Sequence, residues 1–237
     1  MPFQVSVFLK AAILWLLDFV MVLPMWLYIK TRTLRIYLRA RLPFRARVLD
    51  IGSGHNPWFR SNVLVDRFIE DSTERPAPIR KDHREFVEGD ATDLPFPDKS
   101  FDFIYCSHIA EHIEDIGRFF QEIQRVGKAG YIETPSYLFE QMVGTTTHVW
   151  ALWVEGNILH AERKWVPGAP ERVYHTMHRA LARHAAFRFL LALMPEFQSM
   201  QFWWKEKFQF ELHEAPLPLA ATKAVAGDQR SAAKLGR

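Results

Sequence analysis

The chain has 237 residues, of which 49% are hydrophobic, so it can bury the core of one large domain. Its single cysteine, Cys106, excludes a disulfide within the chain and a cysteine-rich zinc cluster. The formal net charge is only +3, but the basic residues are unevenly spread along the sequence.

An apolar stretch followed by a basic one makes up the first 47 residues. Residues 11–29 carry a single charge, Asp18, and are nearly long enough to span a bilayer. Residues 30–47 hold seven basic residues and no acidic one. Three interpretations stay open: a membrane span, a helix lying in the membrane interface, or a lid over the globular domain. Asp18 and Pro24 weigh against a span, and the basic run favours anionic headgroups. We therefore expect a peripheral anchor at the cytoplasmic face of a membrane.

Short apolar segments then alternate with a helical pattern, which is typical of a parallel sheet. The five expected strands are residues 47–52, 62–67, 85–90, 101–107 and 130–135. Between the fourth and the fifth strand, residues 111–126 space their apolar side chains at helical intervals and predict a helix.

The pattern changes after Pro135. Residues 148–165 predict a hairpin that turns at residues 155–157, and residues 175–194 predict a helix. Residues 199–214 predict one or two closing antiparallel strands. The expected organisation is a leader (1–45), a domain (46–214) with a substrate-side insertion (136–170), and a disordered tail (215–237).

The first expected strand ends in the segment LDIGSGHNP, residues 49–57. Glycine at positions 52 and 54 lets the backbone turn sharply and approach a ligand closely. Asp66 ends the second strand, where a carboxylate is placed to accept hydrogen bonds from two ribose hydroxyls. Asp90 and Ala91 follow the third strand, where a carboxylate and a backbone amide can contact an adenine edge.

Taken together, residues 48–135 resemble the class I S-adenosylmethionine-dependent methyltransferases, and especially the type 11 small-molecule group. The matching segments, in the expected order, are DIGSG, VDR, EGDATDLPFPDKSFDFIYCSHIAEHI and GYIETPS. The resemblance implies an α/β, Rossmann-like, seven-stranded and mostly parallel sheet with helices on both faces, and S-adenosyl-L-methionine as cofactor. Many members have a third glycine in the loop, where this chain has His55-Asn56-Pro57. Asn56 tolerates an unusual backbone angle, so we expect a working loop; the alternative is weakened cofactor affinity.

The resemblance also implies roles for individual residues. Gly52 and Gly54 would line the methionine part of the cofactor. Asp50 would hold a water or an amide near the cofactor's amino group, or else cap the loop. Ser107 and His108 would lie over the edge of the cofactor, or else serve the structure alone.

Residues His108 to His112 also match the pattern H-x-x-E-H of inverted zinc peptidases. On a helix, His108 and His112 would share one face, but a zinc site needs a third ligand and partners for the ring nitrogens. The cofactor motifs predict this segment as the helix after the fourth strand without any zinc. We therefore expect a methyltransferase with no metal, rather than a peptidase.

Methyl transfer from a sulfonium is an in-line displacement, so positioning in a dry pocket supplies much of the rate. A hydroxyl acceptor would need a general base, and His108 and His148 are the candidates because histidine titrates near neutrality. For each of them, a purely structural role is the alternative.

The acceptor is expected to be a small or membrane-borne molecule: a lipid, a quinone or a lipid-linked sugar. Methylases of nucleic-acid bases carry an Asn/Asp-Pro-Pro-aromatic string after the fourth strand, where this chain has Ser107-His108-Ile109-Ala110. The basic excess also lies beside the apolar leader rather than in a stripe with aromatic residues, which argues against nucleic acid. Two alternatives remain: a soluble enzyme acting on a metabolite or sugar, and a catalytically silent cofactor-binding or scaffold protein.

Overall fold

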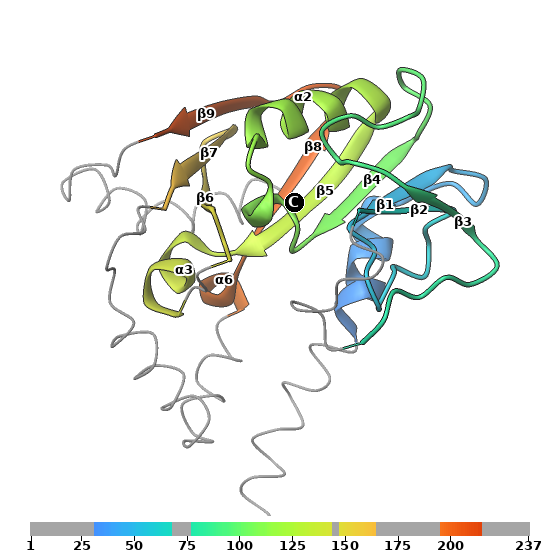
Figure 1. The fold of residues 1–237 in the computed structure, drawn as a ribbon, viewed down its shortest axis with the longest axis horizontal. Coiled ribbons are helices and arrows are strands. Elements are labelled where there is room, and N and C mark those ends of the chain that lie inside the picture. Colours follow the sequence, from blue (N-terminus) through green and yellow to red (C-terminus); the bar gives the residue numbers. More distant parts are fainter. Residues whose placement is uncertain (1–30, 68–76, 144–146, 165–194, 215–237) are drawn as a thin grey trace, which may run out of the picture.

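The computed structural model describes residues 31–67, 77–143, 147–164 and 195–214 (Figure 1). Within this part of the chain, one sheet has the strand order β3-β2-β1-β4-β5-β8 and a smaller one has the order β6-β7-β9. The strands of the main sheet are β1 (Val48–Ile51), β2 (Val63–Asp66), β3 (Glu85–Glu88), β4 (Phe103–Ser107), β5 (Ala129–Pro135) and β8 (Ser199–Lys205).

The five strands that the apolar segments predict are confirmed, and they run parallel to one another. All side chains of β1 and β2 are buried, as expected for parallel strands covered on both faces. The expectation of seven strands is wrong for the described chain, because the main sheet has six. The last strand, β9 (Gln209–His213), pairs with β7 of the smaller sheet instead of extending the main one.

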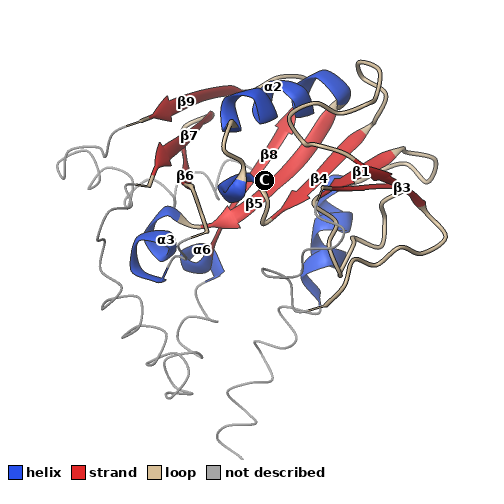
Figure 2. Ribbon diagram, in the orientation of Figure 1, coloured by secondary structure: helices blue, strands red, loops and turns tan. Residues whose placement is uncertain are grey.

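Helices cover both faces of the main sheet, as expected (Figure 2). On one face, α2 (Ile116–Val126) buries its apolar side chains against the strands. This helix begins later than the predicted residue 111, because the Asp115 side chain accepts a hydrogen bond from the Arg118 backbone at 3.0 Å and caps it. A short 3-10 turn, η1 (Ala110–His112), stands before it.

On the opposite face, residues 31–40 form a helix that packs on the sheet (Figure 1). Ile36 is buried there beside Trp58, whose ring stacks on Tyr105 at 4.8 Å between centroids. The Trp58 Nε1 group also donates to the Thr33 carbonyl at 3.2 Å. This end of the basic run therefore covers the globular domain. Within the described residues, no helix is both long and apolar enough to cross a membrane, and residues 11–29 lie outside the described part.

The smaller sheet contains the predicted hairpin, formed by β6 (Trp150–Glu155) and β7 (Ile158–Arg163). Gly156, with φ of +58°, makes the turn between them. Of the two closing strands expected near the end, β8 is antiparallel to β5, but β9 runs parallel to β7. Helices α3 (Tyr137–Val143) and α6 (Pro195–Gln198) lie together near the end of β5 (Figure 1).

Two predicted segments, the helix over 175–194 and the tail over 215–237, lie outside the described residues. The predicted boundaries of the leader, the domain and the insertion stay predictions. What the fold does establish is a switch point: the chain builds β2 and β3 on one side of β1, then returns to place β4 on the other side. Ligands of open α/β sheets bind at the carboxyl ends of the strands at such a point.

Candidate active site

The glycine loop after β1 turns at this switch point. Gly52 and Gly54 have φ angles of +69° and +51°, in the left-handed region that favours glycine. The Gly52 amide donates to the Val65 carbonyl at 2.8 Å, which holds the loop against β2. A Cβ atom at Gly52 would lie 2.9 Å from Cγ1 of Ile109, so the turn after β4 packs directly on the loop.

Asp66, the last residue of β2, contacts this loop. Its Oδ2 atom accepts a hydrogen bond from the Gly54 amide at 2.9 Å, and its side chain is largely buried. The structure therefore brings the glycine loop into contact with Asp66, the residue that the sequence analysis places at the ribose of the cofactor.

The Asp50 side chain is buried and does not face solvent at the loop. Its Oδ2 atom accepts hydrogen bonds from the Trp58 amide at 2.7 Å and from the Ser61 hydroxyl at 3.3 Å. Burial raises the pKa of Asp50 to about 7, although these hydrogen bonds and the charge of Arg84 oppose the shift. These contacts are those of a residue that holds the loop, one of the two roles considered for it.

Asp90 and Ala91 follow β3, as the sequence predicts. Asp90 accepts hydrogen bonds from the Thr92 amide and hydroxyl, both at 2.8 Å, and forms an ion pair with Arg67 at 2.8 Å. Although partial burial opposes it, these contacts lower the pKa of Asp90. Ala91 is buried and packs in the main core. The Asp90 carboxylate is therefore ionised and fixed in a turn.

Ser107, at the end of β4, accepts a hydrogen bond from Arg32, a residue that the sequence interpretation did not assign to the site. The Arg32 guanidinium donates to Ser107 Oγ at 2.6 Å and forms an ion pair with the buried Glu133 at 3.0 Å. Glu133 also accepts a hydrogen bond from the Tyr131 hydroxyl at 2.5 Å. A signal was present, because Arg32 and the apolar Ile36 are one helical turn apart and so share the inward face.

His108 has φ of +57°, a strained conformation for a side chain of this kind. Its amide donates to the Glu133 carbonyl at 2.8 Å, and its Nδ1 lies 3.3 Å from Oε1 of the buried Glu111. Burial opposes the charged form, but the hydrogen bond and charge of Glu111 raise the pKa of His108 above its ordinary value. The expectation that His108 and His112 share a helical face is wrong, because His108 precedes the 3-10 turn.

His148 stands just before β6 and is oriented by a carboxylate. Its Nδ1 lies 2.7 Å from Oε2 of Glu140, a buried residue of α3. Lys164 forms an ion pair with the same carboxylate. The His148 and His112 rings meet edge to face, with centroids 4.6 Å apart. The structure thus joins His148 to the turn after β4, a contact that sequence spacing does not reveal.

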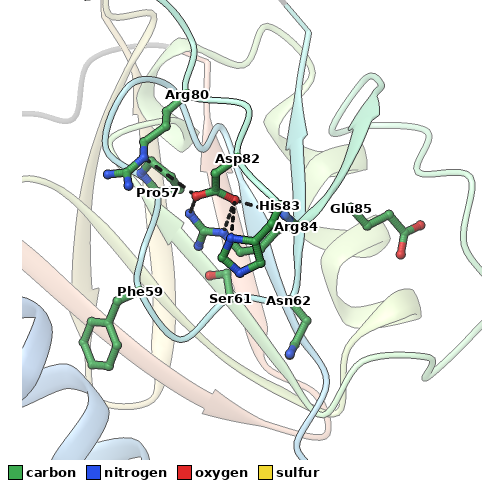
Figure 3. A pocket seen from close by; sticks show the side chains of 9 residues that line it. All are labelled: Pro57, Phe59, Ser61, Asn62, Arg80, Asp82, His83, Arg84 and Glu85. Carbon is green, nitrogen blue, oxygen red and sulfur yellow. Dashed lines mark hydrogen bonds and ion pairs between the residues drawn. The ribbon is translucent and has the colours of Figure 1, made fainter.

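A pocket of about 530 Å³ lies between the loop after β1 and the segment before β3 (Figure 3). Asp82 lies between two of its arginines, 2.6 Å from Arg84 and 3.7 Å from Arg80 (Figure 3). Arg84 also donates to the Trp58 carbonyl at 2.7 Å. The hydrogen bond from Arg84 lowers the pKa of Asp82. None of the residues that the sequence predicts for the cofactor lines this pocket.

Sequence comparisons match part of this chain to methyltransferases. Residues 64–132 match the family described as "Methyltransferase domain". The uncharacterized methyltransferase YcgJ of Bacillus subtilis (strain 168) is 34% identical over 92 residues, which cover 35% of this chain and 36% of that protein. The demethylmenaquinone methyltransferase of Roseiflexus sp. (strain RS-1) is 34% identical over 97 residues, which cover 37% of this chain and 41% of that protein.

Among solved structures, a SAM-dependent methyltransferase from Aquifex aeolicus is 17% identical, with a TM-score of 0.30. The match covers 39% of this chain and 57% of that one. The chain spans roughly two fifths of the length of the two curated relatives. The fold assignment therefore rests on the strand order and the glycine loop of the chain itself.

Proposed function

We propose that this chain, which contains a class I S-adenosylmethionine-dependent methyltransferase domain, transfers a methyl group from that cofactor to a small-molecule acceptor. The family match over residues 64–132 implies the cofactor. The observation that carries the proposal is the contact between the glycine loop and Asp66 at the switch point, where the Gly54 amide donates to Asp66 Oδ2 at 2.9 Å.

The residues of the loop fit this cofactor. Only glycine fits the turn at position 52, because its φ is positive and a Cβ atom there would collide with Ile109. We assign the ribose hydroxyls to the Asp66 carboxylate and the adenine edge to Asp90 and Ala91. When bound, the cofactor supplies a methyl group activated by a positive sulfonium. The chain's task is then to hold the acceptor in line and to exclude water.

Calorimetric titration of S-adenosylhomocysteine into the full chain tests the cofactor site. We expect saturable micromolar binding that Asp66→Ala weakens at least about tenfold, because a carboxylate accepting two ribose hydrogen bonds is removed. Asp93→Ala is the matched control, since the Asp93 side chain is 81% exposed and its ion pair to Arg118 spans 3.7 Å. Absence of binding by folded wild-type chain would overturn the proposal in favour of a scaffold protein.

For the acceptor, we propose a quinol or a similar membrane-borne hydroxyl compound. The Roseiflexus relative is named for a quinone substrate, demethylmenaquinone, which supports a quinone-type acceptor. Transfer to a hydroxyl needs a base, and the two candidates, His108 and His148, each have a carboxylate beside Nδ1. A carboxylate that accepts a hydrogen bond from Nδ1–H fixes the tautomer in which Nε2 is unprotonated, so Nε2 can accept the proton of the acceptor hydroxyl.

Radiolabelled methyl transfer can be followed to a quinol dispersed in phospholipid vesicles and, in parallel, to a water-soluble catechol. We expect faster transfer to the quinol, and we expect His148→Ala to lose turnover while keeping S-adenosylhomocysteine binding. Transfer to the soluble acceptor alone would support the alternative, a soluble metabolite enzyme.

We also propose contact with an anionic membrane surface through residues 1–47, with the domain at the cytoplasmic face. In the described part of this segment, Leu34 and Leu38 are 47% and 62% exposed and lie one helical turn apart. Arg41 and Arg45 follow them closely in the sequence. Such a mixed apolar and basic surface binds at the interface of anionic bilayers.

Co-sedimentation of the full chain with vesicles checks the membrane proposal. We expect binding to phosphatidylglycerol vesicles, weaker binding to phosphatidylcholine vesicles, and a loss of binding for the double variant Leu34→Gln, Leu38→Gln. Deletion of residues 1–45 is a poor test, because it would strip Ile36 and Arg32 from the core. Equal sedimentation with and without lipid would remove the membrane from the proposal.

A further inference from the structure

Three side chains from two separate segments converge beside the turn after β4. Glu111 and His112 belong to η1, and His148 precedes β6. One ligand atom from each, a carboxylate oxygen and two imidazole nitrogens, lies within 4.8 Å of the other two. Metal bonds of 2.0–2.2 Å bring such atoms to a common centre with only small side-chain movements.

The backbone fixes the two segments against one another. The Val149 amide donates to the Glu111 carbonyl at 2.7 Å, and the Trp150 Nε1 group donates to the Ile113 carbonyl at 2.9 Å. Trp150 is buried, so this contact belongs to the core. The three side chains therefore converge on a rigid part of the fold, as a bound ion requires.

His148 has the supporting contact that metal-binding histidines almost always show. Its Nδ1 is 2.7 Å from Oε2 of Glu140, and Lys164 holds the same carboxylate. Donation of the Nδ1 proton to Glu140 fixes the tautomer and leaves the Nε2 lone pair for a ligand. Glu140 is itself buried, and the low local dielectric strengthens its hydrogen bond to His148.

Glu111 gives an independent reason to expect a cation. Its side chain is 1% exposed, and its Oε2 atom has no hydrogen-bond partner within the described part of the chain. A buried carboxylate oxygen without a partner is costly, and such atoms in native proteins usually indicate a missing water or ion. The other oxygen, Oε1, lies 3.3 Å from His108 Nδ1.

We propose that Glu111, His112 and His148 bind a divalent transition-metal cation of the zinc type. Two imidazoles and one carboxylate are the ligand set of catalytic zinc sites, which keep a fourth position open for water or substrate. That open position would take an oxygen ligand such as an acceptor hydroxyl, whose pKa the metal lowers. With the metal bound, Nε2 of His148 would be a ligand and could not act as the base.

A second cluster, formed by His160, Glu211 and His213, does not support the same inference. There the two imidazoles are hydrogen-bonded to each other, with His160 Nδ1 3.1 Å from His213 Nε2. The Glu211 side chain is 56% exposed. This cluster provides the matched control.

The test is calorimetric titration of zinc sulfate into the full chain, stripped with a chelator and free of cofactor. We expect one zinc ion per chain with submicromolar affinity, a loss of more than about 100-fold in His148→Ala, and no change in His213→Ala. Glu140→Gln, which keeps every ligand, should weaken zinc binding about 10- to 100-fold. Circular dichroism checks that each variant is folded. If His148→Ala does not fold, the comparison of Glu140→Gln with wild type is the test.

Cobalt(II) gives a second readout of the same site. We expect visible absorption bands of low-coordinate cobalt that His148→Ala removes and His213→Ala keeps. Absence of saturable zinc binding, or equal binding in wild type and His148→Ala, would overturn the proposal. The titration contains no S-adenosylhomocysteine, so its failure leaves the methyltransferase proposal in place, and failure of cofactor binding leaves the metal proposal in place.

Discussion

Ile109 closes the space above Gly52: its Cγ1 atom lies 2.9 Å from the position that a Cβ on residue 52 would occupy. The loop after β1 and the turn after β4 are therefore one packed unit. Because these two segments flank the switch point of the sheet, any side chain at position 52 would push apart the walls of the proposed cofactor site.

Gly52→Ala should therefore lower both stability and cofactor binding. The backbone, at φ of +69°, contributes about 1–2 kcal/mol of destabilisation, and the contact with Ile109 adds to it. Gly156→Ala is the control, because its φ is +58° and nothing lies within 4 Å of its Cβ position. In urea unfolding and in S-adenosylhomocysteine titration, Gly52→Ala should lose more stability and more binding than Gly156→Ala. Equal losses of binding in the two variants would contradict the packing argument.

Arg32→Met should destabilise the fold by about 3 kcal/mol in urea unfolding. Glu133 is 2% exposed, and removing its ion-pair partner leaves a buried carboxylate that, within the described residues, still accepts a hydrogen bond from the Tyr131 hydroxyl. Arg45→Met, at an exposed position in the same basic run, should change stability by less than about 0.5 kcal/mol. Similar effects of the two substitutions would show that residues 31–40 do not dock through Arg32.

Asp50 should make the stability of the fold pH-dependent. Its pKa is about 7 in the folded state, mainly because of burial, against 3.8 for an ordinary aspartate. Between pH 4 and pH 7 the folded state holds the extra proton, so stability falls as pH rises through this range and levels off above it. The contribution is at most about 4 kcal/mol.

Asp50→Asn keeps an acceptor for the Trp58 amide but cannot ionise. Wild type should therefore lose stability between pH 4 and pH 7 by an amount that the variant does not lose, so the unfolding free energy of the variant should rise relative to that of wild type over this range. Chemical unfolding at several pH values measures this difference. A pH-independent difference would mean that Asp50 has an ordinary pKa.

Trp58→Ala should cost about 3–5 kcal/mol of stability. The Trp58 ring is 1% exposed, stacks on Tyr105 and joins the helix at residues 31–40 to the sheet. Phe59→Ala, the neighbouring aromatic at 58% exposure, should change stability far less. Thermal unfolding of both variants checks the prediction, which fails if the two are equally destabilised.

The sequence by itself determined the parallel strands, the hairpin and the glycine loop. Apolar segments of strand length, closed by glycine or aspartate, can be recognised locally, because burial on both faces demands a continuous apolar run. The acidic strand end at Asp66 could be placed near the loop for the same reason, since neighbouring parallel strands end at the same edge.

Only the tertiary structure decided which distant side chains meet. Arg32 belongs to a basic run whose composition favours membrane headgroups, yet it forms an ion pair with the buried Glu133 of β5. His148 lies 37 positions beyond Glu111, yet the hydrogen bond from the Val149 amide to the Glu111 carbonyl brings the two segments together. Side-chain periodicity records which face of an element is buried, but not which element covers it. The edge of the main sheet and the histidine cluster therefore depend on long-range packing that no local pattern encodes.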